Sequence, residues 1–269
     1  MPYSYLAAPY PQYLSVIPPM ATGAVSIYHS LQIKAQKQFG SGLTFLVAYT
    51  AQKLIDDCST TAVVGAASSL QNIYDLPGER AVSSNDVSQL LTISYVYELP
   101  FGKGKRFGRG WNRGVDAVLG GWQVNGITTL STGLPVLVTT QNTSHAGGAV
   151  LRPNNDGHTA NLGGPVEGRL NKYFDTSVFS QPAPFTFGNT GRTLPDVRVP
   201  GEKNFDFSLF KNFALTERMT LQLRAESFNW LNTPRFGRPN QNANAAQFGV
   251  ISGTANSPRQ MQLALKLLW

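Results

Sequence analysis

The chain has 269 residues and a formal net charge of +7, with 42% hydrophobic but only 14% charged residues. So small a charged fraction, together with 26 glycines and 17 prolines, is typical of strands joined by turns and loops and not of an ordinary soluble domain. No run of about eighteen apolar residues occurs, which excludes a transmembrane helix, and the dispersed basic residues accompany no nucleic-acid-binding motif, which argues against a nucleic-acid partner.

The amino-terminal stretch 1–27 is rich in proline and tyrosine without a sustained period, so it predicts a loop. Apolar and polar side chains then alternate, and a period of two indicates a strand with two different faces. The first two strands are expected near 28–39 and 43–53, joined as a hairpin by the glycine turn at 40–42. Lys37 is the misfit on the apolar parity of the first strand.

Five more strands follow by the same criterion, near 88–99, 120–132, 204–213, 219–229 and 259–269. Between them, 54–87, 136–203 and 229–258 lose the period and are expected to be long loops. An irregular stretch as long as 136–203 is unusual in a compact soluble domain. The sequence therefore predicts an all-β chain in which residues 28–269 form one unit.

The last strand gives the clearest signal. One face is apolar over its whole length, and the other is largely polar and carries Lys266. Roughly ten residues is the length of a tilted strand that crosses a membrane, and alternation closed by an interfacial aromatic is typical of outer-membrane barrels. The apolar face consists of Met261, Leu263, Leu265, Leu267 and Trp269.

The lengths of the connections support the same fold class. In chain order every second connection is a large one, and outer-membrane barrels place short turns on the periplasmic side and long loops outside. With Trp269 at the periplasmic end, the turns at 40–42, 100–119 and 214–218 all fall on that side. The prediction is an antiparallel transmembrane β-barrel segment of about seven strands, with residues 1–27 as the remnant of an extracellular loop.

Three separated motifs carry a resemblance to a known family. They are Leu99-Pro100-Phe101-Gly102-Lys103-Gly104-Lys105, Gly120-Gly121-Trp122-Gln123-Val124-Asn125-Gly126 with the later Gly133-Leu134-Pro135, and Glu226-Ser227-Phe228-Asn229-Trp230-Leu231-Asn232-Thr233-Pro234-Arg235-Phe236-Gly237. In this order, and with the strand 259–269 behind them, they resemble the closing part of the Oar-like TonB-dependent receptors. The resemblance covers essentially the whole chain after about Tyr28.

The resemblance implies a signal peptide, a plug with a TonB box and a barrel of about twenty-two strands. It also implies transport energised through a TonB partner. None of the front parts is recognisable here, so the chain is expected to be the back portion of a longer protein, unable to transport alone. The apolar face of 259–269, ending on Trp269, is similar to the signal that barrel-assembly machinery reads.

Charged side chains fall on the polar parity of several predicted strands, where a barrel lumen tolerates charge. We expect them to pair with one another as structural ion pairs, with a substrate pathway as the alternative. They are Lys34, Glu98, Asp206, Arg224, Glu226 and Lys266. Large aromatics on the other parity are expected to form girdles at the membrane interfaces; these are Tyr49, Tyr95, Tyr97, Trp122 and Trp269.

Other candidate chemistry is weak. The glycines of 102–108 fit neither dinucleotide nor P-loop spacing and no helix is expected after them, so a basic periplasmic turn, placed where it can meet anionic headgroups, is the better interpretation. The three histidines are scattered, and Asp56 and Asp57 beside the lone Cys58 have no metal-site spacing. We expect solvated loop residues there, with divalent-ion binding as the alternative. No nucleophile elbow or paired acid and base occurs, so neither enzymatic activity nor a cofactor is predicted.

The resulting hypothesis is the C-terminal barrel portion of a TonB-dependent receptor in the outer membrane of a Gram-negative-type cell, for an unidentified ligand. Its expected partners are outer-membrane lipid, barrel-assembly machinery, the TonB system through the missing front part and the extracellular ligand. A non-transporting structural or adhesive barrel is the first alternative. A soluble β-rich binding module is the second.

Overall fold

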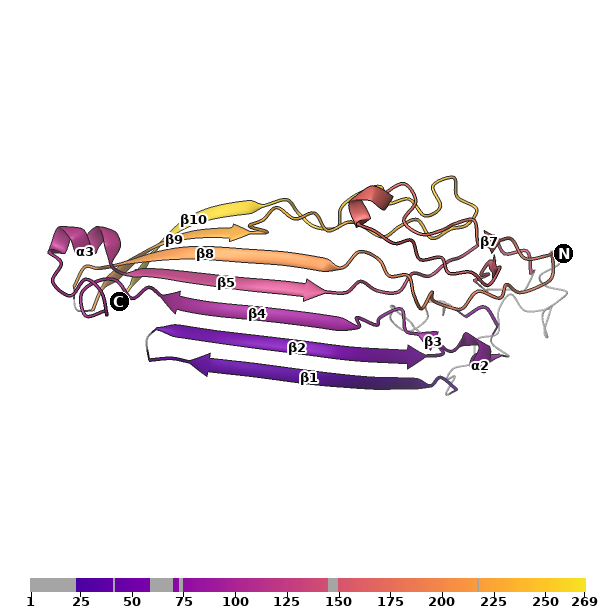
Figure 1. Cartoon of the computed structure of the whole chain (residues 1–269), viewed down its shortest axis with the longest axis horizontal. Coiled ribbons are helices and arrows are strands. Elements are labelled where there is room, and N and C mark those ends of the chain that lie inside the picture. The colour runs from indigo at the N-terminus through magenta and orange to yellow at the C-terminus, as the bar shows by residue number, and fades with distance from the viewer. Residues whose placement is uncertain (1–22, 41, 59–69, 73–74, 145–149, 217) are drawn as a thin grey trace.

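The computed structural model describes residues 23–40, 42–58, 70–72, 75–144, 150–216 and 218–269. Seven long strands form one antiparallel sheet in which each strand pairs with the next along the chain (Figure 1). The strands are β1 (Ser26–Gln38), β2 (Leu43–Asp56), β4 (Gln89–Glu98), β5 (Trp122–Ser131), β8 (Glu202–Ala214), β9 (Thr220–Phe228) and β10 (Gln260–Leu268). The all-β prediction is confirmed, and every strand begins and ends within three residues of its expected bounds.

The short elements lie in the connections. A two-residue strand, β3 (Ala81–Val82), adds to β2, and β6 (Asn154–Asn155) pairs with β7 (Phe179–Ser180) as a separate ribbon. The helical elements are α2 (Leu76–Glu79), α3 (Arg113–Leu119) and the 3₁₀ turn η1 (Val166–Arg169). No helix in the described ranges combines the length and the apolar character that crossing a membrane requires.

The two ends of the sheet differ in the length of their connections (Figure 1). We call the end with connections 39–42, 99–121 and 215–219 the turn end, and the end with connections 57–88, 132–201 and 229–259 the loop end. The first hairpin turns on Gly42, whose φ of 87° is disfavoured for other residues. Long and short connections therefore alternate as the sequence predicted.

The strand register divides the sheet into two faces, because residues directly opposite one another in an antiparallel pair point to the same side. Tyr97 lies opposite Leu43 and Val124, and Val124 lies opposite Leu209. The apolar face continues to β10, where Leu263 lies opposite Ala225. We call this side the apolar face and the reverse side, which carries Thr44, Ser94, Asn125, Ser208, Glu226 and Gln262, the polar face.

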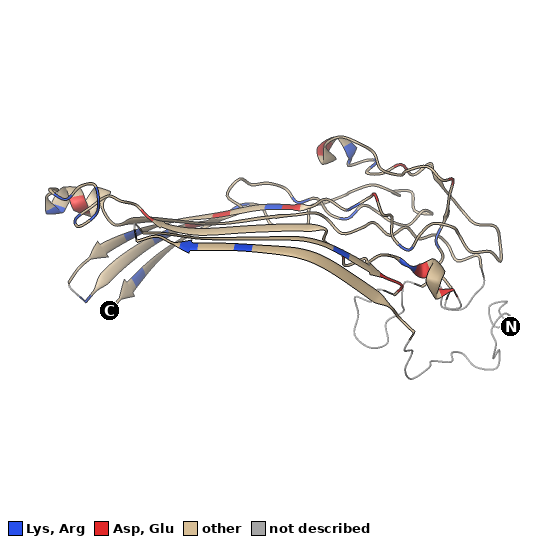
Figure 2. Ribbon diagram, turned by 60° about the horizontal axis from the view of Figure 1, so that its bottom comes forward, with Lys and Arg blue, Asp and Glu red and all other residues tan. Residues whose placement is uncertain are grey.

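No hydrophobic side chain of the seven long strands, in the residues that the structure describes, is fully buried. On β10, Leu263 is 78% exposed, and Trp269 just beyond the strand is 91% exposed. The sheet is a single layer, and the described chain covers neither face completely (Figure 2). No second layer of the described chain covers the apolar face as a whole; local contacts remain, such as the Trp230 ring 5.4 Å from that of Phe207.

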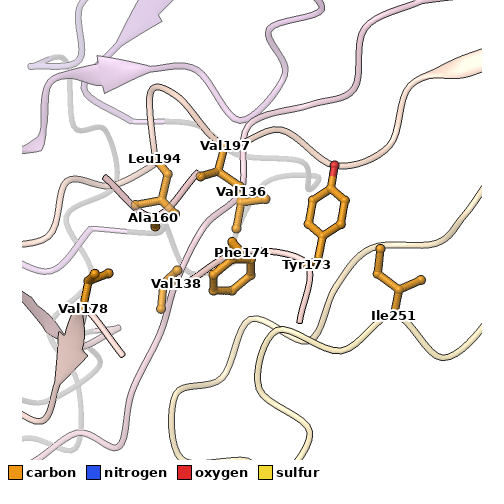
Figure 3. Packing of buried hydrophobic residues seen from close by; sticks show 9 residues of the cluster. All are labelled: Val136, Val138, Ala160, Tyr173, Phe174, Val178, Leu194, Val197 and Ile251. Atoms are coloured by element: carbon orange, nitrogen blue, oxygen red, sulfur yellow. The ribbon is translucent and has the colours of Figure 1, made fainter. Parts of the chain in front are cut away.

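The hydrophobic core lies instead in the connections of the loop end (Figure 3). Phe174 is fully buried, and its ring meets those of Phe179 and Phe248 edge to face at 6.1 and 5.3 Å. The core consists of Val136, Val138, Ala160, Tyr173, Phe174, Val178, Leu194, Val197 and Ile251. We call the connections 132–201 and 229–259, packed around this core, the loop cluster.

The loop cluster adds a feature that the sequence did not predict. The stretch 136–203 is largely irregular, as predicted, but several of its apolar residues, such as Val136, Val138 and Phe174, are as buried as those of a soluble core. These residues are too far apart in the sequence to produce a period. Only the folded path of the chain brings Val136 to Leu194 and Val197, whose backbones exchange hydrogen bonds of 2.8 and 2.9 Å.

A correction concerns the glycine-rich stretch 102–108, after which no helix was expected. Helix α3 follows it four residues later, begins behind Asn112 and ends before Gly120. The Asn112 side chain accepts a 2.8 Å hydrogen bond from the Val115 amide, which is an ordinary N-cap. So short a helix gives too few residues for a helical period to be recognised.

Candidate functional site

The polar face forms an open trough of about 510 Å³ at the middle of the sheet. It crosses β2, β4, β5, β8 and β9, so that no single strand defines it. Amide and hydroxyl side chains, two carboxylates and a comparable number of apolar and aromatic side chains line it, among them Gln123, Asn125, Ser208, Asp206, Glu226 and Phe210. Such a surface combines hydrogen-bonding groups with apolar side chains, and its two charged lining residues, Asp206 and Glu226, are both acidic.

The polar side chains hold one another across the strands. Gln123 Nε2 donates to Asn125 Oδ1 at 2.7 Å, and Asn125 Nδ2 donates to Ser208 Oγ at 3.2 Å. On β9, Arg224 Nε donates to Gln222 Oε1 at 2.6 Å, and its guanidinium lies 4.7 Å from the centre of the Phe210 ring. The polar face is therefore an ordered network that fixes the position of its donors and acceptors.

The register places all six charged residues predicted for a lumen on the polar face: Lys34, Glu98, Asp206, Arg224, Glu226 and Lys266. The expectation that they pair with one another is wrong, since no ion pair among the described residues joins two of them. Glu98 pairs with Lys105 of the turn end at 2.6 Å, and the Glu226 carboxylate accepts a hydrogen bond from the side-chain amide of Gln262. Glu98, Asp206, Arg224 and Glu226 bond instead to a turn residue or to amide groups, partners that strand parity does not reveal.

Asp206 has a specific structural partner in the third family-like motif. Its Oδ1 accepts the Asn229 amide at 2.9 Å. Asn229 has a left-handed φ of 51°, which asparagine tolerates better than most residues. Its side chain accepts from the Thr233 amide at 2.9 Å and donates to the carbonyls of Thr233 and Ser257, both at 3.2 Å. The motif thus ties both ends of the 229–259 connection to the rim of the trough.

At the loop end, buried ion pairs join the 57–88 connection to the loop cluster. Arg152 Nη2 donates to Glu79 Oε1 at 3.1 Å, its Nη1 contacts the other carboxylate oxygen, and both side chains are at most 4% exposed. Glu79 Oε1 also accepts the amides of Gln71 and Asn72 at 3.0 Å each. The buried carboxylate is therefore fully hydrogen-bonded, as its burial requires.

Two further arginines complete this set. Arg192 pairs with Asp56, and its Nε donates to the Glu79 carbonyl at 3.1 Å. Arg198 pairs with the fully buried Asp86 at 2.6 Å. We call the three pairs Glu79–Arg152, Asp56–Arg192 and Asp86–Arg198 the loop clamp.

The sequence analysis missed the loop clamp and misjudged Asp56 and Asp57, which were expected to be solvated. They are 8% and 6% exposed, and both oxygens of Asp57 accept the Val25 amide at 2.9 and 3.0 Å. Burial also raises the pKa of the neighbouring Cys58 thiol. The partners of the clamp lie 73, 136 and 112 residues apart, so no local signal joins them.

Two groups of the loop cluster have shifted pKa values. A hydrogen bond from Lys172, 2.8 Å away, and others from Ser177 lower the pKa of Asp175 to about 2. Burial raises the pKa of Tyr173, whose hydroxyl donates to the Arg198 carbonyl at 2.6 Å. Tyr173 thereby links the core to the loop clamp. Both groups have a structural role, because neither lies against a nucleophile or a second acidic group among the described residues.

The structure brings no metal ligands together in the described ranges, where no group of three His, Cys, Asp or Glu side chains has the spacing to hold an ion. His29 lies on β1, and His158 contacts Asp156 at 3.1 Å on the exposed surface. His145 lies outside the described residues.

The predicted girdle aromatics all belong to the apolar face. Tyr49, Tyr95, Tyr97 and Trp122 are partly exposed there, and none of them enters the hydrophobic core of the loop cluster. Tyr95, Tyr97 and Trp122 lie near the turn end, whereas Tyr49 lies six positions from the start of β2. The predicted assembly residues Met261, Leu263, Leu265 and Leu267 form one exposed row on β10.

Comparison with known proteins gave one match. Residues 3–262 match the family model described as outer membrane beta barrel domain. No curated protein and no solved structure matched the chain.

Proposed function

We propose, from the premise that this chain belongs to the outer membrane beta barrel domain family, that it forms the closing part of the barrel of a TonB-dependent receptor. In this proposal the apolar face meets lipid, the polar face lines the lumen, and a ligand from outside passes along it. The turn end is periplasmic and the loop end extracellular, as short turns and long loops are distributed in such barrels.

One observation carries the proposal: a single-layered sheet with an uncovered apolar face and an ordered polar face. In water such a sheet would expose an extended row of large apolar side chains, of a kind that soluble monomers rarely show outside binding sites. In an outer membrane the same surface is solvated by lipid, and the polar network lines the interior. The arrangement weighs against the second alternative, a soluble β-rich binding module.

The strand directions support a larger barrel. Both edge strands, β1 and β10, run from the loop end to the turn end, because the sheet has seven long strands in strict alternation. The sheet therefore cannot close on itself with an antiparallel seam, and an odd number of additional strands must complete it. A receptor barrel of about twenty-two strands meets this condition with about fifteen further strands.

The proposed partners follow from these surfaces. Lipid covers the apolar face, and barrel-assembly machinery binds the exposed row ending in Trp269. The TonB system acts through a plug and TonB box supplied outside the described strands. An extracellular ligand meets the loop cluster first. We propose no enzymatic activity, since the polar face offers donors and acceptors but no paired acid and base.

A structural or adhesive barrel without transport is the second candidate, and the loop cluster favours it. The cluster has its own core and three buried ion pairs, so it presents a rigid surface at the proposed cell exterior. Rigid surfaces suit recognition of another surface as well as capture of a small ligand.

An antibody raised against this chain separates the candidates. Outer membranes of the source cells are solubilised with detergent after formaldehyde treatment, and the captured polypeptide is mapped by mass spectrometry. The receptor proposal expects plug peptides in the same polypeptide and TonB crosslinked to it. An outer-membrane polypeptide without plug peptides and without crosslinked TonB would support the structural or adhesive barrel instead. An antigen released without detergent would contradict both.

A further inference from the structure

The connection between β4 and β5, residues 99–121, is unusually basic for its length. It contains Lys103, Lys105, Arg106, Arg109 and Arg113 but only one acidic residue, Asp116. The Asp116 carboxylate is engaged internally, since its Oδ1 accepts the Lys103 amide at 2.7 Å. Of the five basic side chains only Lys105, through Glu98, pairs with a carboxylate among the described residues. The other four are exposed at the turn end (Figure 2).

Helix α3, which lies within this connection, exposes apolar side chains that a helix in water would be expected to bury. Val115, Val118 and Leu119 are 37%, 65% and 50% exposed and lie three and four positions apart, on one side of the helix. The polar Asp116 points inward instead. Phe101 and Phe107 add two further exposed rings, 5.8 Å apart, with the Arg106 guanidinium 5.4 Å from the Phe107 ring. Apolar and cationic groups are thus interleaved on one surface.

The end of α3 is fastened to the apolar face of the sheet. Trp122, whose side chain belongs to that face, donates from Nε1 to the Val118 carbonyl at 2.9 Å. Lys211, also of the apolar face, donates from Nζ to the Gly120 carbonyl, and its ammonium lies 5.4 Å from the Trp122 ring centre. The C-terminal end of α3, with its exposed stripe, is therefore fixed at the turn-end margin of the surface assigned to lipid.

We propose that α3 and its basic flanks form an interfacial anchor that binds anionic phospholipid headgroups of the periplasmic leaflet. A short helix with an apolar stripe and flanking Lys and Arg lies in the plane of a membrane interface, with its stripe among the acyl chains. Trp122 and Lys211 hold it at the depth where headgroups begin. The cations Lys103, Arg106, Arg109 and Arg113, which pair with no carboxylate among the described residues, then face phosphate oxygens. This anchor requires the barrel but not the receptor function.

A membrane surface fits better than an anionic polysaccharide of the periplasm. A purely anionic polymer would account for the cations but not for Val118 and Leu119, which gain nothing from it. Anionic lipid accounts for both, because each Lys or Arg near such a surface adds electrostatic attraction and the stripe adds apolar burial.

Headgroup selectivity is the first test. The protein is purified from outer membranes in detergent, and its binding of phosphatidylglycerol and phosphatidylcholine is measured by native mass spectrometry. We expect a preference for phosphatidylglycerol that Arg106→Gln with Arg113→Gln lowers by roughly 30-fold at low salt. Arg80→Gln with Arg238→Gln removes two exposed charges at the loop end and is the matched control, expected to leave the preference unchanged.

Depth of insertion is the second test and does not depend on charge. In a Cys58→Ser background, Val118→Cys is labelled with a polarity-sensitive fluorophore, and the protein is placed in vesicles of phosphatidylcholine and phosphatidylglycerol. Quenching by a spin-labelled lipid and protection from aqueous iodide are expected. Gly163→Cys at the loop end, where a Cβ has open space, should show the reverse.

Each result decides. Equal binding of the two lipids, or a preference that the control variant abolishes just as well, would overturn headgroup recognition. A label at position 118 that iodide quenches as fully as at 163 would overturn the interfacial helix. Binding of isolated cell wall that depends on Arg106 and Arg113, without lipid preference, would replace the membrane by an anionic polymer.

Discussion

The sheet and the loop cluster fold by different rules within one chain. In the loop cluster Val136, Val138 and Phe174 are completely buried, as in a soluble protein. In the sheet the equivalent large side chains, such as Leu263 and Leu265, remain 78% and 66% exposed. The apolar side chains of the loop cluster bury one another, whereas those of the sheet need an apolar environment that the described chain does not provide.

The two regions also differ in where their charged side chains lie. The loop cluster and its neighbours bury the carboxylates of three arginine–carboxylate pairs. In the strands, all the acidic side chains described for the trough and Arg224 lie on the polar face and bond to amides and turns, whereas lysines such as Lys211 also occur on the apolar face. A buried pair needs complete hydrogen bonding to offset desolvation, and the loop clamp provides it. The two regions should therefore fail independently when one of them is damaged.

The largest effect is expected from Glu79→Ala. It leaves the Arg152 guanidinium buried without a carboxylate and removes the acceptor of two backbone amides, which costs about 3–5 kcal/mol. Hydrogen exchange followed by mass spectrometry should show faster exchange in 70–82 and 150–194 and unchanged exchange in β4 and β5. Glu202→Gln is the control, because the Glu202–Arg235 pair is 35% and 44% exposed and contributes about 0–1 kcal/mol. Equal acceleration in the strands would mean that the two regions form one cooperative unit.

These regions also differ in how far the sequence predicts them. Every long strand and both faces were predictable, because alternation is a local signal that each strand carries alone. The loop clamp was not, since Asp56 meets Arg192 across 136 residues and nothing near either residue marks the other. The same holds for the core, in which Ile251 joins residues of a different connection.

For the charged residues of the strands, parity predicted the face but not the partners. Asp206 illustrates this: its position on the polar face was predicted, but the Asn229 amide that it accepts belongs to a loop whose path depends on a left-handed residue. The left-handed conformation is a property of tertiary structure and leaves no periodic trace. The motif around Asn229 was recognisable only by resemblance.

A second prediction tests the solvent of the apolar face. Leu263→Arg places a charge in the middle of β10 on that face and should destabilise the folded protein in vesicles by about 2–4 kcal/mol. Gln262→Arg is the matched neighbour on the polar face, beside Glu226, and should be close to neutral. Urea unfolding in lipid vesicles measures both. If the two variants lost the same stability, the assignment of the faces would fail.

A smaller effect is expected where the regions join. Asn229→Ala removes the hydrogen bonds with Thr233 and Ser257 and places alanine at a positive φ, which should cost about 1–3 kcal/mol. Asn229→Gly keeps the backbone conformation and loses only the side chain, so it should recover part of the loss. Exchange rates of the amides in 229–259 provide the measurement. If Asn229→Gly is no more stable than Asn229→Ala, the whole loss of stability comes from the missing hydrogen bonds.

The smallest effect concerns pH and is confined to the loop cluster. Because Lys172 and Ser177 hold the pKa of Asp175 at about 2, below its usual value, ionised Asp175 favours the folded cluster. This contribution is fully present above the unfolded pKa and disappears as the pH falls from about 5 to about 2. The Lys172–Asp175 pair is at the surface, so the change should be slight. The difference in unfolding midpoint between the wild type and Asp175→Asn should shrink over that range, while Lys172→Gln should raise the pKa of Asp175 in a carboxyl NMR titration. A wild-type pKa near 4 would show that the pair does not persist in solution. The stability of the strands should be unaffected by Asp175→Asn, by Lys172→Gln and by the fall in pH.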